Sequence, residues 1–319
     1  MPELKIVVTD CSWNVIDVEK KYLPSDASVK GYQCKSEEEV IAVCEDADAI
    51  LSECAPFSKN VLEKLKKCKI ISNTAVGVDN IDVEAASDLG IAVANVPGYC
   101  AGEVADHTVA LMLAFNRDII GYHQMIKNKA WRMKSVLPIK RMSTQTMGLI
   151  GFGDIAQAVT RRALGFGMKI LVYSRRKEKV EAFGLQMVEL DELLEQSDIV
   201  SIHCALNERT EGLIYKEKFL KMKKKPLLIN TSRGKVVDGK DLIEALEQGL
   251  IRGAALDVLE NEPPNFSNPL FKMENVIITP HAGFYSEEAL EEVRRRSALN
   301  IKNYLNENYD EVSLVNGVR

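Results

Sequence analysis

The sequence predicts an α/β protein with two doubly wound domains, each built on a parallel sheet. Short apolar segments alternate with helix-like segments along the whole chain, which is typical of β-α-β units with helices on both faces of the sheet. The 319 residues are too many for one ordinary hydrophobic core. A second series of strands also begins after a long helical pattern at residues 101–126. Together these observations indicate two domains of similar architecture.

The first domain has four apolar strand candidates with helices between them. Its strands are expected at 4–10, 49–51, 69–74 and 91–96. The segment 58–68 is expected to be helical, because Val61, Leu62 and Leu65 fall on one face at helical spacing. The N-terminal residues lack the basic head and long apolar run of a signal peptide and are expected to begin the first strand directly.

The second domain follows with six strand candidates, the number in a complete dinucleotide-binding fold. Its strands are expected at 146–151, 169–173, 198–203, 227–231, 253–257 and 275–279. The helical pattern at 101–126 would bridge the two domains. A final helix is expected at 286–308, where Ser286 would be the N-cap and glutamates occupy the first turn.

Composition and charge exclude several classes of function. Hydrophobic residues make up 46% and charged residues 27% of the chain, as in globular proteins that fold in water. The net charge of −5 disfavours nucleic-acid binding, and no apolar run approaches the roughly 18 residues that span a membrane. The seven cysteines are scattered without a C-x-x-C pair. We therefore expect free thiols in the cytoplasm, with no metal site, no nucleic-acid partner and no membrane partner.

A glycine-rich turn joins the strand at 146–151 to the next helix. Gly151 permits a tight turn, Gly153 lets the backbone approach a pyrophosphate, and the small Ala156 allows close packing of helix on strand. The start of that helix would offer its N–H groups and positive dipole to the phosphates. The position of the turn between a strand and a helix strengthens a motif that is weak alone. The predicted phosphate contacts are Gly151, Phe152, Gly153, Asp154 and Ile155.

The end of the next strand, at Tyr173, predicts which dinucleotide binds. An acidic residue at the following position usually holds the ribose 2′-hydroxyl of NAD. This chain has Ser174 there, followed by Arg175 and Arg176. Serine removes the repulsion of a 2′-phosphate, and the two guanidinium groups can pair with that phosphate. We therefore expect NADP(H) to be favoured over NAD(H), with a solvated basic loop as the alternative interpretation.

Four further segments indicate the family. They are AVGVDNID (75–82), INTSRGKVVD (229–238), LDVLENEPP (256–264) and TPHAGFYSEE (279–288). Together with the glycine-rich turn, these segments resemble the D-2-hydroxyacid dehydrogenase family across essentially the whole chain. The resemblance implies two Rossmann-like domains with the active site in the cleft between them. It also implies a substrate domain formed by residues 1–100 and 285–319, and a dinucleotide-binding domain at 101–284.

The resemblance implies a catalytic set of one arginine, one glutamate and one histidine. Arg233 would fix the carboxylate of a 2-oxo acid and polarise its C2 carbonyl, a task that suits the fork of a guanidinium. His281 would be the proton donor, and Glu262 would orient its imidazole. Glu260 is a competing carboxylate in the same segment. The implied activity is hydride transfer between NADP(H) and C2 of a 2-oxo acid or D-2-hydroxy acid.

Further cofactor contacts are expected at the ends of other strands. Asp257 resembles the family's aspartate that bonds the nicotinamide carboxamide, and Thr108 matches a position near the nicotinamide. The remaining predicted cofactor contacts are His203, Cys204, Ala205, Thr210, Thr231, Ser232 and Gly283.

The implied substrate is a small 2-oxo or 2-hydroxy acid. Val76 and Gly77 would present backbone N–H groups to its carboxylate, and Cys54, Tyr99 and Phe284 are the selectivity candidates by position. The family's glyoxylate and hydroxypyruvate reductases tend to carry a small residue at the position of Phe284. An aromatic side chain there suits a 2-oxo acid with an apolar side chain, whereas simple packing between the domains is the alternative.

Two alternatives to a 2-oxo acid reductase stay open. One is a dinucleotide-sensing interaction protein that resembles the C-terminal binding protein corepressors, which also carry an aromatic at the position of Phe284. The other is a short 3-phosphoglycerate dehydrogenase. The resemblance further implies a homodimer, formed through the helix at 101–126 and an arm at 129–133 whose Trp131 would be buried in the partner.

Overall fold

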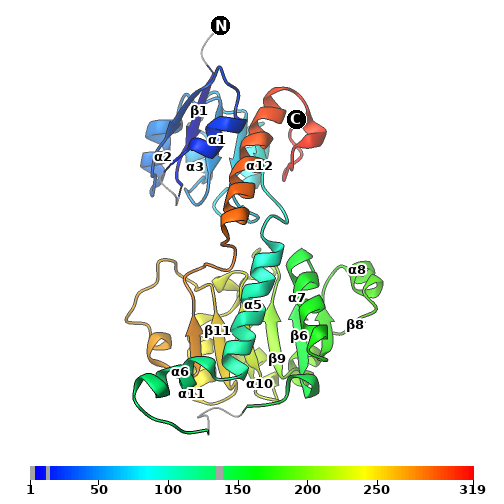
Figure 1. Cartoon of the computed structure of the whole chain (residues 1–319). Coiled ribbons are helices and arrows are strands. Elements are labelled where there is room, and N and C mark those ends of the chain that lie inside the picture. Colours follow the sequence, from blue (N-terminus) through cyan, green and yellow to red (C-terminus); the bar gives the residue numbers. More distant parts are fainter. Residues whose placement is uncertain (1–3, 12–14, 134–138) are drawn as a thin grey trace. The chain divides into compact units, whose positions relative to one another are not determined.

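The computed structural model describes residues 4–11, 15–133 and 139–319 (Figure 1). The chain divides into two compact units. The first unit comprises Met1–Tyr99 and Ser286–Arg319, and the second unit comprises Cys100–Tyr285. Each unit holds a parallel sheet with apolar clusters on both of its faces. The prediction of two doubly wound α/β domains is therefore confirmed.

Within the described residues, five parallel strands form the sheet of the first unit, in the order β2-β1-β3-β4-β5. They are β1 (Lys5–Val8), β2 (Ser28–Gly31), β3 (Ala49–Ser52), β4 (Ile70–Asn73) and β5 (Ala92–Ala94). This order is one of the two common orders of doubly wound sheets. The helices of the first unit are α1 (Asp17–Tyr22), α2 (Glu37–Cys44), α3 (Lys59–Leu62), α4 (Val83–Asp88) and α12 (Glu287–Leu305).

The described part of the second unit holds seven parallel strands in the order β12-β11-β10-β9-β6-β7-β8. They are β6 (Thr146–Ile150), β7 (Lys169–Tyr173), β8 (Gln186–Met187), β9 (Ile199–Ile202), β10 (Leu227–Asn230), β11 (Gly253–Leu256) and β12 (Val276–Ile278). The chain order reverses between β6 and β9, and ligands of open α/β sheets bind outside the carboxyl ends of the strands at such a point.

Helices cover both faces of this second sheet (Figure 1). They are α5 (Ala101–Asn116), α6 (Ile119–Lys127), α7 (Asp154–Gly165), α8 (Lys177–Ala182), α9 (Leu190–Gln196), α10 (Lys216–Lys221) and α11 (Gly239–Glu247). Neighbouring residues of β6 point to opposite faces: Ile150 belongs to the apolar cluster that includes Phe219 of α10, whereas Leu149 belongs to the cluster that includes Met112 of α5. Strands buried on both faces are continuous apolar runs, which is why the sequence showed them clearly.

The C-terminal helix α12 belongs to the first unit because it is bonded there by a buried ion pair. Arg294 is 6% exposed, and its Nε and Nη2 each lie 2.7 Å from an oxygen of Glu19 on α1, which is 2% exposed. Such bidentate pairs fix the relative orientation of two helices. As predicted, Ser286 caps α12, because its Oγ accepts the N–H of Ala289 at 2.9 Å.

Two helix predictions are corrected by the structure. The single helix expected at 101–126 is two helices, because the chain leaves the right-handed conformation at Asp118, whose φ is +50°. Aspartate tolerates this left-handed conformation better than most residues. The helix expected at 58–68 is much shorter, since α3 ends at Leu62. No helix in the described ranges is both long and apolar enough to cross a membrane.

Candidate active site

The glycine-rich turn after β6 has the conformation that a pyrophosphate site needs. Gly151 has a φ of +96°, which residues with side chains rarely adopt. A Cβ atom there would lie 2.8 Å from backbone atoms of His203 and Cys204, so a larger residue does not fit. The space in front of Gly153 is open, and α7 begins directly after it without a side-chain cap. The N–H groups at this helix start therefore suit an anionic ligand.

The side chains within this turn differ in what they can contact. Phe152 is 2% exposed and packs edge-on against Phe183, so its backbone alone can face a ligand. Asp154 is exposed in the first turn of α7, and Ile155 is half-buried. Because two anionic groups repel each other, the carboxylate of Asp154 must point away from any bound phosphate.

Basic side chains follow β7 directly. The Oγ of Ser174 accepts the N–H of Arg176 at 3.0 Å, and a hydroxyl in this role can still donate its own hydrogen. Arg175 and Arg176 are exposed, and neither forms an ion pair with another described residue. Lys177 instead pairs with Glu181, at 3.5 Å. The two arginines are thus available to an anionic ligand.

The residues that follow β9 contribute uncharged side chains to the site. Burial lowers the pKa of His203 to about 4, and its Nε2 lies 2.8 Å from the Oγ of Ser201. Burial raises the pKa of the Cys204 thiol to about 11. Both side chains are therefore neutral near pH 7. Thr210 donates through Oγ1 to the carbonyl of Ala205 at 2.7 Å, which closes the loop that follows.

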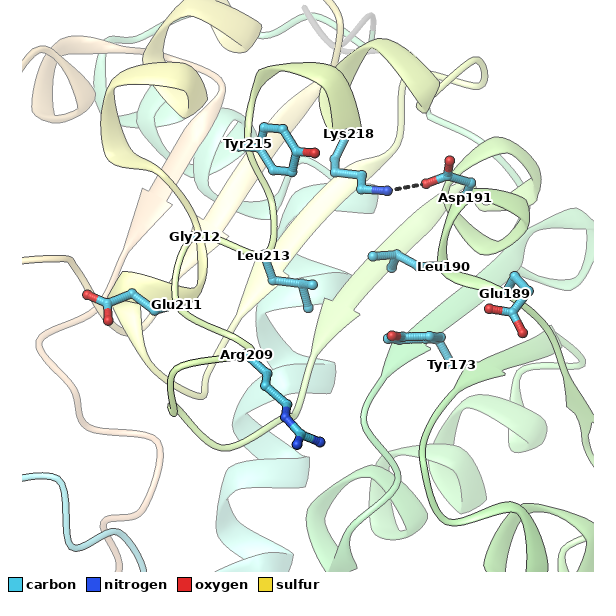
Figure 2. A pocket seen from close by; sticks show the side chains of 10 residues that line it. All are labelled: Tyr173, Glu189, Leu190, Asp191, Arg209, Glu211, Gly212, Leu213, Tyr215 and Lys218. Atoms are coloured by element: carbon cyan, nitrogen blue, oxygen red, sulfur yellow. Dashed lines mark hydrogen bonds and ion pairs between the residues drawn. The ribbon is translucent and has the colours of Figure 1, made fainter.

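A pocket of about 580 Å³ is lined by the end of β7, the start of α9 and residues between Arg209 and Lys218 (Figure 2). Leu190, Leu213 and Tyr173 lie across its middle, and Arg209 lies at one end. Arg209 is exposed and forms no ion pair within the part of the chain that the structure describes. Arg209 could not be predicted from the sequence, because a single arginine in a polar loop has no distinguishing pattern. Its neighbour in the pocket, Tyr173, directly precedes the predicted ribose position.

The end of β10 positions Arg233 through the side chain of Asn230. The Nδ2 of Asn230 donates to the carbonyl of Arg233 at 2.9 Å, and its Oδ1 accepts the N–H of Ser232 at 3.0 Å. The guanidinium of Arg233 donates to the carbonyl of Ser232 at 2.8 Å. Thr231 and Thr108 are bonded to each other through their hydroxyls at 2.9 Å, so both side chains are committed within the protein. An asparagine at this point therefore fixes the turn that carries the arginine.

Gly234 allows a second segment to pack against this turn. A Cβ atom on Gly234 would lie 2.0 Å from the carbonyl of Leu259, so any other residue would push that segment away. The N–H of Leu259 in turn donates to Oε1 of Glu262 at 2.8 Å. This glycine therefore brings the segment that carries Glu262 next to the arginine turn.

Glu262 and His281 form a short hydrogen-bonded contact. The Nδ1 of His281 lies 2.6 Å from Oε2 of Glu262, so the imidazole is oriented and its Nε2 is left to face a ligand. Burial raises the pKa of Glu262, but the hydrogen bond and charge of His281, the Leu259 N–H and the charge of Arg233 together hold that pKa below its usual value. The carboxylate is therefore ionised at neutral pH and stabilises a positive charge on the imidazole.

The backbone around His281 is held by Asp257. His281 has a φ of +53°, a left-handed conformation, and its N–H donates to the carbonyl of Asp257 at 2.8 Å. The carboxylate of Asp257 accepts the N–H groups of Ala282 and Gly283, each at 2.9 Å. The ring of Phe284 lies edge-on to the imidazole, with centroids 6.5 Å apart. The structure thus brings Arg233, Glu262, His281, Asp257, Gly283 and Phe284 together in the second unit.

The remaining predicted substrate contacts lie in the first unit. The carboxylate of Asp10, at the end of β1, accepts the N–H of Cys54 at 2.6 Å and so holds the loop after β3. Asparagine side chains donate to the carbonyls of Val76 and Gly77, each at 2.7 Å. This segment is therefore held through its carbonyls, which leaves its N–H groups to a ligand. Tyr99 is half-buried where the first unit ends.

Comparison with known proteins identifies the family. The family model for the "D-isomer specific 2-hydroxyacid dehydrogenase, NAD binding domain" matches residues 109–283, more than half of the chain. The chain belongs to the D-isomer-specific 2-hydroxyacid dehydrogenase family. It is therefore an NAD(P)-dependent oxidoreductase, and the prediction of this family is confirmed.

Relatives of this dehydrogenase carry several names. It is 40% identical over 273 residues to a glyoxylate reductase of Korarchaeum cryptofilum, which covers 83% of this chain and 82% of the relative. It is 41% identical over 258 residues to a D-3-phosphoglycerate dehydrogenase of Methanocaldococcus jannaschii, with 80% of this chain covered. The dehydrogenase spans only 49% of the length of that second relative.

Solved structures share its fold over nearly the whole chain. A D-lactate dehydrogenase from Aquifex aeolicus, complexed with NAD and lactic acid, is 29% identical with a TM-score of 0.89, over 98% of this chain and 99% of that one. An acyclic imino acid reductase in complex with NADPH and D-Arg is 31% identical with a TM-score of 0.88, over 97% of this chain and 99% of that one. Both cofactors thus occur among structures similar to this dehydrogenase.

Proposed function

We propose that the enzyme transfers a hydride between NADP(H) and C2 of a 2-oxo acid or D-2-hydroxy acid. The observation that carries this proposal is the 2.6 Å contact between His281 and Glu262, beside Arg233 at the carboxyl ends of the strands of the second unit. We assign the second unit as the dinucleotide-binding domain, because the matched NAD-binding family model lies within it. The first unit is then the substrate domain.

The chain's own side chains supply the acid–base and electrostatic parts of the reaction. The guanidinium of Arg233 binds the carboxylate of the substrate and stabilises negative charge that develops on the C2 oxygen. The Nε2 of His281 delivers a proton to that oxygen during reduction and removes it during oxidation. Glu262, ionised and bonded to Nδ1, stabilises the imidazolium form before the proton is delivered. When bound, the reduced nicotinamide supplies the hydride that adds to C2.

The residues of the second unit fit a dinucleotide. Its pyrophosphate would lie over the open face of Gly153 at the start of α7, where the positive φ of Gly151 and the lack of a Cβ let the chain turn closely. Thr108 and Thr231 are buried, His203 is half-buried, and all three are bonded to the protein, so we propose that they shape the site rather than bind the cofactor through polar atoms. Asp257 keeps one acceptor position on Oδ2 for a carboxamide, since that oxygen accepts only the N–H of Gly283 among the described donors.

The preference for NADP(H) rests on the chain after β7. Ser174 lacks the negative charge that would repel a 2′-phosphate, and Arg175 and Arg176 are exposed without ion-pair partners among the described residues. Arg209 lines a pocket together with Tyr173 and so adds a further cation near the end of β7. The three guanidinium groups favour a dianionic phosphate, so we propose NADP(H) as the cofactor.

Replacement of Arg175 by alanine tests this preference. We expect the ratio of kcat/KM for NADPH to that for NADH to fall roughly 10- to 100-fold, because one charge-assisted hydrogen bond to the 2′-phosphate is lost. The matched control is Lys177→Ala in the same segment, whose cation already pairs with Glu181 and whose loss should leave the ratio unchanged. An equal ratio in wild type and Arg175→Ala would contradict the assignment.

We expect residues of the first unit, together with Phe284, to determine which acid the enzyme reduces. We propose that Val76 and Gly77 bind the substrate carboxylate, and that Cys54, Tyr99 and Phe284 select its side chain. The edge-on contact of Phe284 with His281 places an aromatic ring next to the proton donor, which favours an apolar side chain on the acid. A panel of glyoxylate, hydroxypyruvate, pyruvate, 4-methyl-2-oxopentanoate and phenylpyruvate distinguishes small from apolar substrates. Turnover of glyoxylate alone would remove the selectivity role of Phe284.

Two other functions compete with this one. A dinucleotide-sensing interaction protein would bind cofactor and reduce none of the acids in the panel. A 3-phosphoglycerate dehydrogenase would oxidise 3-phosphoglycerate and is favoured by the similarity to the relative of that name, although the chain spans about half of its length. Adding 3-phosphoglycerate with each oxidised cofactor to the panel separates all three functions.

We further propose a homodimer in the cytoplasm, where the seven cysteines would stay reduced. Ile119 and Ile126 of α6 are 57% and 51% exposed, and Trp131 and Met133 in the segment after it are 87% and 93% exposed. Such a patch is typical of an interface. Trp131→Ala should therefore raise the dimer dissociation constant by roughly 30-fold or more, measured by sedimentation velocity. Wild-type protein that sediments as a monomer at micromolar concentration would contradict the dimer.

A further inference from the structure

His107, on the buried helix α5, contacts the turn that carries His281. Its Nε2 lies 2.9 Å from Oγ1 of Thr279 and 3.3 Å from Oδ1 of Asp257. The Oγ1 of Thr279 is itself 2.6 Å from the same oxygen of Asp257. His107 thus contacts the residues that follow β11 and β12, and the helix that carries it packs on one face of the sheet.

The donors and acceptors of this cluster fit one arrangement. Burial raises the pKa of Asp257, but hydrogen bonds from His107, Thr279, Gly283 and Ala282 outweigh it and hold that pKa below its usual value. The ionised carboxylate has no hydrogen to donate, so Thr279 gives its single hydroxyl hydrogen to Asp257. Thr279 must then accept the hydrogen on Nε2 of His107. The result is a directed series of hydrogen bonds from imidazole to hydroxyl to carboxylate.

This series ends on the backbone of the catalytic turn. The carboxylate of Asp257 accepts the N–H groups of Ala282 and Gly283, and its carbonyl accepts the N–H of His281. His281 lies between these contacts in the left-handed conformation, with a φ of +53°, which costs energy for a residue with a side chain. A Cβ on Gly283 would lie 2.8 Å from Oδ2 of Asp257 and 3.4 Å from Cδ2 of His107, so the turn is packed against both.

We propose that His107 is a positioning residue for the proton donor. By donating through Nε2 to Thr279, it fixes the carboxylate of Asp257, and Asp257 fixes the strained backbone that aims His281 at the substrate. The Nε2 of His107 is occupied by Thr279, so His107 itself delivers no proton. This inference rests on the proposed function, because it requires His281 to be the acid. Correct aim matters because a displacement of about 1 Å of a reacting group lowers rates by about 100-fold.

The test compares His107→Leu, which cannot donate, with His107→Gln, whose amide nitrogen reaches the position of Nε2. For His107→Leu we expect kcat to fall by about 10- to 100-fold. The KM for the acid should be unchanged. The dissociation constant of NADPH, measured by the fluorescence of the bound cofactor, should rise by less than kcat falls, because Oδ2 of Asp257 keeps its hydrogen bond to the N–H of Gly283. His107→Gln should recover most of the lost kcat.

Two further variants separate positioning from stability. Val109→Ala, also on α5 and 8% exposed, should lower the melting temperature and leave kcat unchanged. Thr279→Val should lower kcat as His107→Leu does, and the double variant should be no slower than the slower single variant, since both act through one series of bonds. If the losses of kcat in the two single variants multiply in the double variant, the proposed series of hydrogen bonds from His107 through Thr279 is refuted. Full kcat in His107→Leu would refute the proposal.

Different results would contradict the role of His281 as proton donor and the positioning role of His107. If His281→Ala keeps full turnover, the assignment of the proton donor is wrong and the role of His107 falls with it. If His281→Ala is inactive while His107→Leu has wild-type kcat, the proposed function stands and the positioning role alone is wrong.

Discussion

Replacing His281 with alanine should lower kcat for 2-oxo acid reduction by about 10²- to 10⁴-fold. The reason is that the C2 oxygen then receives its proton from water rather than from an oriented imidazole, which in this structure is held by Glu262 at 2.6 Å. The dissociation constant of NADPH should stay close to that of wild type, because the backbone contacts of this turn do not use the imidazole. Initial rates and cofactor fluorescence measure the two quantities independently.

The variant Glu262→Gln tests the role of the carboxylate charge beside His281. A glutamine keeps a hydrogen-bonding oxygen beside Nδ1 but removes the charge that stabilises the imidazolium, so kcat should fall less than in His281→Ala. Glu260→Gln is the matched control, because Glu260 is exposed in the same segment and is not bonded to His281 within the described residues. A kcat in His281→Ala equal to that of wild type would remove the acid–base assignment.

Replacing Arg233 with alanine should lower kcat/KM for the acid by about 10²- to 10⁴-fold, because two charge-assisted hydrogen bonds to the carboxylate are lost. Most of the effect should appear in KM, and the part that stabilises the C2 oxygen should appear in kcat. Arg233→Lys should recover little of the loss, since an ammonium is a point charge without the planar fork. Initial-rate measurements over a range of acid concentrations check these expectations.

A nearby lysine, Lys235, provides the control for Arg233. Lys235 is exposed two positions further along the chain, so Lys235→Ala changes the net charge equally without touching the proposed site. It should behave as wild type. A wild-type KM and kcat in Arg233→Ala would show that the substrate carboxylate is bound elsewhere.

The strands with apolar residues could be predicted from the sequence, but two edge strands, β2 and β8, could not. β4 and β10 are four-residue strands that begin with apolar residues, and every residue in them is buried. β2 and β8 lie at the edges of their sheets, contain residues such as Lys30 and Gln186, and have no buried residue. Nothing in the local pattern distinguishes such strands from a loop, because their pairing comes from the neighbouring strand.

The site residues that follow strand ends could also be predicted from the sequence. In a parallel sheet the carboxyl ends of the strands meet at one edge, so the residues after β6, β7, β10 and β12 had to converge. His107 was missed because its contacts depend on packing between elements 172 residues apart. Arg209 was missed because the pocket around it forms from three separate segments. Single-sequence patterns carry no record of such contacts.

The rate at which wild-type enzyme oxidises NADPH in the presence of a 2-oxo acid measures the proposed reaction itself. Initial rates are compared with NADPH and NADH, for each acid of the panel, with the acid-free rate subtracted. We predict acid-dependent oxidation of the cofactor with at least one acid, at a higher kcat/KM for NADPH than for NADH. Higher efficiency with NADH would contradict the cofactor assignment, and no acid-dependent oxidation with either cofactor would contradict the proposed reaction.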